Sequence, residues 1–315
     1  RLGPQWGTDG RPSLAWGPVT KLEVTPERYR KVTAVALVAL VFIVVTGASV
    51  RLTGSGLGCP DWPTCDGSQV VSEFRDTPEI IEFVNRMITG LVSVAVAAAV
   101  LGARRRQPYR RDLVLLAWGL VAGVVAQIVL GGITVLLELT PPAVMGHFLL
   151  SMALVADAVV LHHRAAEPDG GQRRPDVPVS TRRLGWALVA LTGLVLLVGT
   201  AVTGTGPHGG DPDVERLPYA IREVVRLHSG LAWVLTAVLL VLMVRIRRGG
   251  LVLAAVAAQI TIGYIQYFNG VPEVLVGLHV LGATLVWITV LQLHLSLWVV
   301  EPAAAPDAEP ALAAP

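Results

Sequence analysis

The chain has 315 residues, of which 53% are hydrophobic and 15% are charged, and its formal net charge is only +2. A mean hydropathy of +0.61 is too high for a soluble globular domain, so the composition predicts an integral membrane protein. The basic residues stand in short clusters between apolar runs, which is typical of membrane loops and excludes a nucleic-acid-binding surface.

The first 29 residues are polar and lack the apolar core and cleavage site of a signal peptide, so we expect a tail at 1–29. A helix needs about 20 apolar residues to cross a bilayer. Eight windows meet this requirement: 31–50, 78–102, 113–137, 142–163, 183–203, 221–245, 250–268 and 273–298. The proline- and alanine-rich end, 301–315, predicts a disordered tail.

Basic clusters indicate how the spans are oriented. They precede the first span and follow the second, fourth and sixth, so all of them fall on one side of the membrane. The positive-inside rule makes that side cytoplasmic. We therefore expect a multi-pass protein of the cell membrane with both termini in the cytoplasm and with the loop after the first span outside.

This outer loop holds Cys59 and Cys65, the only cysteines of the chain. Disulfides persist on the extracytoplasmic face, and a zinc site would need more ligands, so the pattern favours a disulfide. Two free thiols or half of a metal site are the alternatives. A disulfide here would fix the shape of the loop or react as a redox group.

The chain contains an internal repeat. Residues 126–149 align without a gap on residues 258–281, and in each copy twenty positions separate a glutamine from a histidine. A weaker match joins TGSG, at 53–56, to TGTG, at 203–206.

The repeat predicts an all-α membrane protein made of two similar four-helix bundles, related by a pseudo-twofold axis along the membrane normal. We expect the N-terminal half at 30–165 and the C-terminal half at 183–300, with a cytoplasmic linker at 166–182 between them.

Three histidines lie inside spans at matched depth. His147, His228 and His279 stand about five to seven residues into spans that enter from outside, some 8–11 Å below the surface. An ionisable side chain in a span indicates function. His228 and His279 are predicted to hold a haem iron between two imidazoles. The alternative is that each histidine only forms hydrogen bonds between helices.

The second span carries Glu82 and Asn85 at the corresponding depth. Asn85 takes the place that His228 has in the repeat, and asparagine is a poor iron ligand. We therefore expect the first half to bind haem through His147 or through no histidine, and to release it. Glu82 lies one turn from Asn85 and has no acidic counterpart, which favours a catalytic role. A carboxylate stabilised by the helix dipole is the alternative.

Other polar residues in or beside the spans receive weaker predictions. The arginines near the outer ends are expected to pair with haem propionates or to extend to lipid headgroups. They are Arg51, Arg86, Arg222 and Arg226. Gln127 and Gln259 are expected to form hydrogen bonds between helices. His162, His163 and His294 lie on the cytoplasmic side as bystanders, and His208 either lines an entrance or is solvated.

Six segments together resemble the bacterial haem A synthases. They are GASVRLTGSGLGCPDWPTCDG (47–67), IEFVNR (81–86), QIVLGGITVL (127–136), GHFLLSM (146–152), RLHSGLAW (226–233) and GLHVLGATLVW (277–287). The resemblance covers about residues 30–295. It implies an enzyme that oxidises a methyl group of haem O to the formyl group of haem A by successive hydroxylations, for the assembly of a haem–copper oxidase.

The resemblance also implies roles for single residues. His228 and His279 would be ligands of a resident haem b in the C-terminal half, and His147 would belong to the substrate haem site in the N-terminal half. Glu82 would be the catalytic acid, with the two cysteines forming the loop disulfide. The family has a histidine where this chain has Asn85, which argues against two histidine ligands for the substrate haem.

The partners that the resemblance implies are haem O, haem A, a haem O synthase and an electron-transfer protein; a homo-oligomer is left open. Two other functions stay as alternatives. A membrane b-type cytochrome for electron transfer would hold haem in both halves, and Asn85 argues against it. A haem carrier or chaperone would perform no chemistry, and the presence of Glu82 in one half only argues against it.

Overall fold

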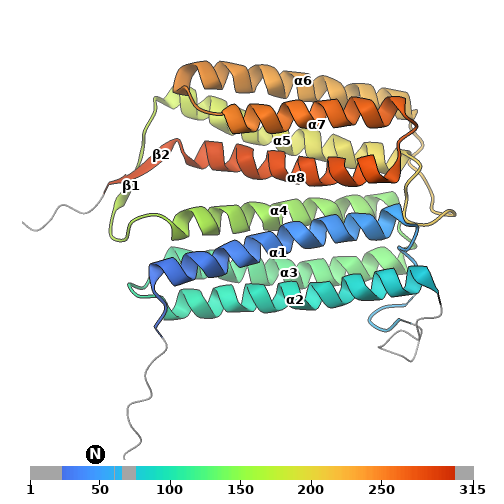
Figure 1. The fold of residues 1–315 in the computed structure, drawn as a ribbon, viewed down its shortest axis with the longest axis horizontal. Coiled ribbons are helices and arrows are strands. Elements are labelled where there is room, and N and C mark those ends of the chain that lie inside the picture. Colours follow the sequence, from blue (N-terminus) through green and yellow to red (C-terminus); the bar gives the residue numbers. More distant parts are fainter. Residues whose placement is uncertain (1–22, 60, 66–75, 302–315) are drawn as a thin grey trace, which may run out of the picture.

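The structure is a computed structural model that describes residues 23–59, 61–65 and 76–301 (Figure 1). Within these residues, eight helices are long and apolar enough to cross a membrane. They are α1 (Pro26–Leu52), α2 (Thr77–Arg105), α3 (Arg111–Leu136), α4 (Pro141–Ala165), α5 (Val179–Thr205), α6 (Ile221–Ile246), α7 (Gly250–Phe268) and α8 (Glu273–Leu295). The prediction of an all-α, eight-span membrane protein is confirmed.

Prolines and capping side chains set several helix starts. Pro26, Pro78 and Pro141 stand in the first turns of α1, α2 and α4, where a missing N–H costs no helical hydrogen bond. Asp76 caps α2 by accepting a hydrogen bond from the main-chain nitrogen of Glu79 at 2.9 Å. Because α1 starts at Pro26, the expected N-terminal tail ends earlier than residue 29. Residues 1–22 and 302–315, where the tails were predicted, lie outside the described residues.

A short strand pair was not expected. β1 (Gln172–Pro175) pairs antiparallel with β2 (Trp298–Glu301), so the segment between the halves is joined to the end of the described chain. The eighth span was predicted to reach residue 298, but α8 ends at Leu295. The apolar and β-branched residues that follow the helix favour a strand once a partner is available.

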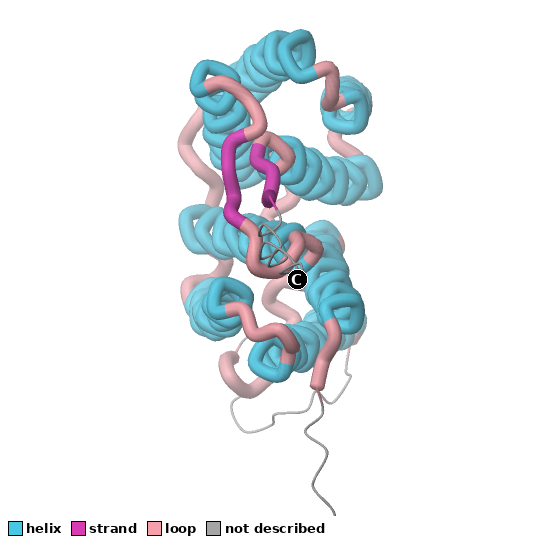
Figure 2. The backbone as a smooth tube through the Cα atoms, turned by 90° about the vertical axis from the view of Figure 1, so that its left-hand side faces the viewer, coloured by secondary structure: helices cyan, strands magenta, loops and turns pink. Residues whose placement is uncertain are grey.

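The helices form two groups, α1–α4 and α5–α8, which Figure 2 shows one above the other. In the first group α1 and α3 each pack against both α2 and α4; in the second, α5 and α7 each pack against both α6 and α8. The groups meet through α4 with α8, α1 with α8, and α4 with α5. Exchanging α1–α4 for α5–α8 leaves this pattern unchanged, as the predicted pseudo-twofold relationship requires.

Apolar side chains lie both in the core and on the outer faces of the bundle, as expected for a protein surrounded by lipid. The buried core of the first group includes Leu40, Val96 and Leu120, while Val35 and Leu91 are mostly exposed on the outer faces. In a membrane such exposed valine and leucine side chains contact lipid, so their exposure needs no protein partner.

Candidate functional site

Each of the three histidines within the spans packs against a glycine of the neighbouring helix. A Cβ atom at the glycine would lie 3.0–3.1 Å from the Cε1 atom of the imidazole in every case. The pairs are His147 of α4 with Gly131 of α3, His228 of α6 with Gly199 of α5, and His279 of α8 with Gly263 of α7. The glycines therefore create the space that lets a histidine lie between two adjacent helices.

The repeated glutamines hold the backbone of two of these histidines. Gln127 donates from Nε2 to the carbonyl oxygen of His147 at 3.1 Å, and Gln259 donates to that of His279 at 2.6 Å. The amide of Gln127 also donates to the hydroxyl of Ser151. The prediction that both glutamines form hydrogen bonds between helices is confirmed, and the two bonds repeat the twenty-residue spacing in three dimensions.

The C-terminal half brings two imidazoles together. The ring centroids of His228 and His279 lie 6.3 Å apart, with an interplanar angle of 63°. Metal–imidazole bonds of roughly 2 Å would place two rings on opposite sides of one metal ion with their centroids about 6 Å apart. In His228, Cε1 is the ring atom nearest to the Cβ position of Gly199, and Nδ1 and Nε2 lie 3.4 and 3.9 Å from that position. The spacing fits two imidazoles that would hold one metal-centred group between them.

Polar atoms of the histidines are left without partners. The Nδ1 atoms of His147 and His279 are buried and form no hydrogen bond with a described residue. Nδ1 of His228 is likewise buried and forms no hydrogen bond with a described residue. Unpaired polar atoms are rare in protein interiors, and they occur often at sites that bind a further group.

The N-terminal half has a different arrangement. Asn85 of α2 has a buried Oδ1 atom with no hydrogen-bond partner among the described residues, and it forms no hydrogen bond with His147. In the described part of the chain, no three His, Cys, Asp or Glu side chains gather where they would hold a bare metal ion. A planar ligand that supplies its own equatorial donors is the kind of group that one or two histidines suit.

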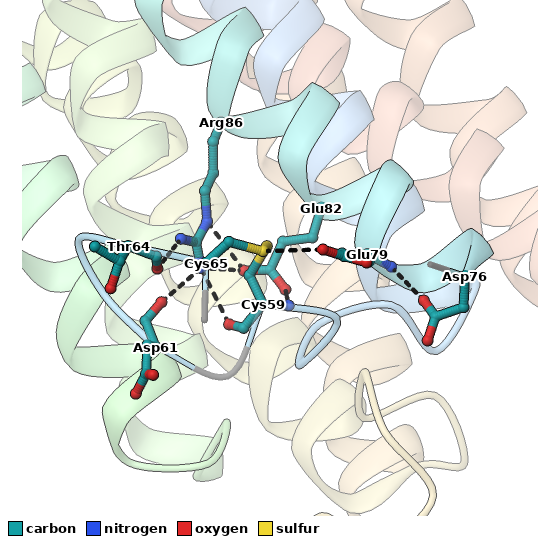
Figure 3. Close-up of a disulfide and its surroundings, with 8 residues drawn as sticks. All are labelled: Cys59, Asp61, Thr64, Cys65, Asp76, Glu79, Glu82 and Arg86. Carbon is teal, nitrogen blue, oxygen red and sulfur yellow. Dashed lines mark hydrogen bonds and ion pairs between the residues drawn. A yellow bond between two sulfur atoms is a disulfide. The ribbon is translucent and has the colours of Figure 1, made fainter. Parts of the chain in front are cut away.

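Cys59 and Cys65 form a disulfide, as predicted, and the alternatives of free thiols and half of a metal site are wrong. We call residues 53–59 and 61–65 the disulfide loop. Both cysteines are buried. The Sγ atom of Cys65 lies 3.8 Å from Oε1 of Glu79, at the start of α2 (Figure 3). The disulfide loop is therefore folded back onto α2.

Glu82 binds the disulfide loop. Its Oε2 atom accepts a hydrogen bond from the main-chain nitrogen of Cys59 at 2.8 Å (Figure 3). Its Oε1 atom accepts from Nη2 and Nε of Arg86 at 2.6 and 3.2 Å. The Glu82 side chain is buried, and both of its oxygens are used. This geometry gives Glu82 a structural role that the sequence did not suggest; its catalytic role stays a prediction.

Arg86 contacts three carbonyl groups of the same loop. Its guanidinium donates to the carbonyl oxygens of Cys59 and Asp61 at 3.1 Å each and to that of Thr64 at 3.0 Å (Figure 3). Arg86 was expected to pair with a haem propionate or to extend to lipid headgroups. In the structure its donors are directed at Glu82 and the loop, so it stabilises the loop conformation.

Arg51 joins the outer loops of the two halves. Its Nη1 atom donates to the carbonyl oxygen of His208 at 2.5 Å, and the main-chain nitrogen of Gly56 donates to that of Gly210 at 3.0 Å. The ring Nε2 of His208 lies 2.7 Å from the carbonyl oxygen of Val271. His208 is thus part of a contact between loops and is not a freely solvated residue.

The remaining candidates lie apart from this region. Arg226 forms an exposed ion pair with Glu223 at 3.6 Å, and Arg222 forms none with a described residue. The three bystander histidines lie at the other ends of the helices. Their contacts are His162 with Thr33 at 2.9 Å, His163 with Glu167 at 3.6 Å, and His294 with the rings of Trp186 and Trp298.

Two features escaped the sequence analysis. Trp62 of the disulfide loop lies on Gly132 of α3, where a Cβ atom would be 2.5 Å from the indole Cδ2 atom. Asp157, inside α4, lies against Gly119, where a Cβ atom would be 2.6 Å from Oδ2. In the sequence, the two consecutive glycines at 131–132 could have indicated a close contact with α3. The carboxylate of Asp157 within a span could have indicated a functional residue.

This chain matches a family model and several known proteins. Residues 30–291 match the model of the family COX15-CtaA, described as cytochrome oxidase assembly protein. Heme A synthase of Lysinibacillus sphaericus is 33% identical over 184 residues, which are 56% of this chain and 59% of the relative. Heme A synthase of Exiguobacterium sibiricum is 26% identical over 168 residues, 53% of this chain and 56% of the relative.

A third relative, the heme A synthase of Shewanella oneidensis, is 29% identical over 186 residues, which are 54% of each protein. The chain thus spans about half the length of the curated relatives that it matches.

Proposed function

We propose, since this chain belongs to the COX15-CtaA family of cytochrome oxidase assembly proteins, that it is a haem A synthase. It would oxidise the methyl group of haem O to the formyl group of haem A. The observation that carries the proposal is the asymmetry between the halves. His228 and His279 face each other at 6.3 Å in one half, whereas Asn85 stands at the matching position in the other.

In the C-terminal half we assign His228 and His279 as the ligands of a resident haem b. Their centroid spacing and their buried, unpaired Nδ1 atoms support this assignment. When bound there, haem b would supply one-electron redox chemistry. Gly199 and Gly263 would hold the two imidazole planes in place, and Gln259 would hold the backbone of His279.

In the N-terminal half we assign the substrate site to the space beside His147 and Asn85. The Oδ1 atom of Asn85 and the Nδ1 atom of His147 are buried and form no hydrogen bond with a described residue, which supports this assignment. A half with one histidine would bind a porphyrin less firmly than a half with two, which suits a site that must release its product. The farnesyl tail of haem O would stay in the lipid.

Glu82 is the residue that we propose to accept or donate protons at the substrate. It lies one turn from Asn85 on α2, and no acidic residue replaces it in the C-terminal half. Its bonds to Cys59 and Arg86 would hold the carboxylate in a single position near the outer end of the bundle. A proton acceptor with a fixed position is more effective than a mobile one.

We propose that the end of the bundle with β1 and β2 faces the cytoplasm and that the disulfide loop is extracytoplasmic. Arg104, Arg105, Arg245 and Arg248 support this orientation, because all four lie at the β1–β2 end of the helices. An oxidising outer compartment would also preserve the disulfide. The partners that we propose are a haem O synthase, which supplies the substrate, and an electron-transfer protein.

The test is to express the chain in a membrane host that makes haem O but no haem A, and to identify the extracted haems by chromatography and mass. Wild type is expected to yield hydroxylated haem O or haem A. Glu82→Gln should keep haem b and lose these products, whereas Glu223→Gln, an exposed acid at the start of α6, should behave as wild type. His279→Ala should lose haem b.

Two results would overturn the proposal. Haem b alone in the wild type, beside a control synthase that is active in the same host, would indicate an electron-transfer cytochrome. Haem O that is bound but returned unchanged would indicate a carrier or chaperone.

A further inference from the structure

Trp62 is a residue of the disulfide loop that contacts α3. Its indole ring packs on Gly132, where a Cβ atom would be 2.5, 2.7 and 2.9 Å from Cδ2, Cε2 and Cγ. Three ring atoms at such distances leave no room for a side chain. Any residue other than glycine at position 132 would displace the indole.

The indole packs on the residue directly after the glycine that contacts the histidine of the N-terminal half. Gly131, the residue before Gly132, packs against the imidazole of His147, with a Cβ-to-Cε1 distance of 3.1 Å. Since consecutive residues point about 100° apart around a helix, Trp62 and His147 pack on different sides of the same turn of α3. Trp62 is 36% exposed as a whole residue, so it is not fully covered by the protein.

In the C-terminal half, a residue of α7 itself supplies an aromatic ring at the position that corresponds to Gly132. The repeat aligns Gly131 with Gly263 and Gly132 with Tyr264. The hydroxyl of Tyr264 accepts a hydrogen bond from Nε1 of Trp233 at 3.1 Å. In both halves, an aromatic ring therefore occurs at the position directly after the glycine that contacts the histidine. In the C-terminal half the ring belongs to the helix, and in the N-terminal half the loop supplies it.

The loop around Trp62 is held at both ends. The disulfide links Cys59, three residues before the tryptophan, to Cys65, three residues after it. The guanidinium of Arg86 binds the carbonyl of Asp61, the residue directly before it, as well as that of Cys59. The position of the indole therefore depends on the disulfide and on the Glu82–Arg86 pair.

We propose that Trp62 contacts the substrate porphyrin in the N-terminal half, and that the disulfide loop serves to hold it there. This inference rests on the proposed function, because it takes the first half as the substrate site. An indole offers a flat, apolar surface that stacks on a planar aromatic ligand. A ring supplied by a loop can also be displaced when the ligand enters or leaves, whereas Tyr264 belongs to a membrane-spanning helix.

The test measures the binding of haem O by absorbance titration of the purified, full-length protein in lipid nanodiscs. Trp62→Ala is expected to raise the Kd about three- to tenfold, the range of a lost aromatic stacking contact, and Trp62→Phe should restore most of the affinity. Gly132→Val should weaken binding to a similar degree, because its side chain displaces the indole and supplies no aromatic ring. Trp118→Ala, which removes an exposed tryptophan of the same helix, should leave the Kd unchanged.

A double-mutant cycle tests the role of the loop. Replacing both cysteines with serine should raise the Kd as much as Trp62→Ala does, and combining the changes should add little, because both act through the indole. Additive losses would show that the disulfide acts on the site by another route. The visible absorption bands of the haem bound by His228 and His279 should be unchanged in every variant. This control would show that the fold is intact.

The outcomes separate the two proposals. If wild type forms haem A but Trp62→Ala retains both the wild-type Kd for haem O and the wild-type KM, the inference about Trp62 is wrong and the synthase function stands. If wild type neither binds nor converts haem O, the proposed function fails, and the inference fails with it.

Discussion

The Nε2 atom of Gln259 lies 2.6 Å from the carbonyl oxygen of His279, in a hydrogen bond that connects α7 to α8 at the depth of the histidine pair. Gln127 makes the corresponding bond to His147 at 3.1 Å. Each bond restrains the backbone of a histidine instead of its ring. The imidazole then keeps both nitrogens for other partners, while the helix that carries it is fixed against its neighbour.

Gln259→Leu is expected to lower the free energy of unfolding by about 0.5–1.5 kcal/mol, because one hydrogen bond between helices is lost. It should also shift the midpoint potential of the haem in the C-terminal half, since the ligand helix is free to move. Spectroelectrochemistry and thermal unfolding in detergent would measure both. Thr261→Val is the control, since this exposed threonine bonds only within α7. Equal behaviour of the two variants would contradict a positioning role for Gln259.

Gly199→Val is expected to remove most of the haem from the C-terminal half. The added side chain would meet the His228 ring, because the Cβ atom alone lies 3.0 Å from Cε1. Overpacking of this kind costs about 1–3 kcal/mol. The ratio of haem to protein, determined as the pyridine haemochrome, would record the loss. Gly193→Val in the same helix is the matched control, as nothing lies within 4 Å of its Cβ position.

Arg86→Lys should make the disulfide loop easier to open, because one ammonium group cannot reach the three carbonyl oxygens and the Glu82 carboxylate that the guanidinium binds. We expect labelling of Cys59 and Cys65 by a thiol reagent, under mild reductant, to be about tenfold faster, which corresponds to about 1.4 kcal/mol. Arg226→Lys, in an exposed ion pair, should not change the rate. A rate equal to wild type in Arg86→Lys would show that the disulfide alone holds the loop.

Asn85→His and His228→Asn form a reciprocal exchange between the halves. Asn85→His is expected to add a second bis-histidine haem and to slow the release of product, because the first half then resembles the second. His228→Asn should weaken haem binding in the C-terminal half, because only His279 remains there as a ligand. Haem-to-protein ratios and the low-spin signals in electron paramagnetic resonance would measure both changes. If Asn85→His adds no low-spin haem, position 85 does not face the same ligand as His147.

The sequence by itself determined the eight spans, the repeat and the residues at matched depth. These features depend on local properties: the length of an apolar run, the spacing of Gln259 and His279, and the distance of a residue from a helix end. The bilayer strengthens the inference, because a chain in lipid must satisfy its backbone hydrogen bonds within the helix. The disulfide was also predictable, since Cys59 has only one possible partner in the chain.

Only the tertiary structure decided which residues meet across helices and loops. It directed Glu82 and Arg86 toward the disulfide loop, placed Trp62 on Gly132, and joined β2 to the segment between the halves. None of these contacts has a periodic pattern, and Trp62 and Gly132 are far apart in the sequence. They depend on how a loop and two helices share a small space, which is a matter of packing that no local pattern encodes.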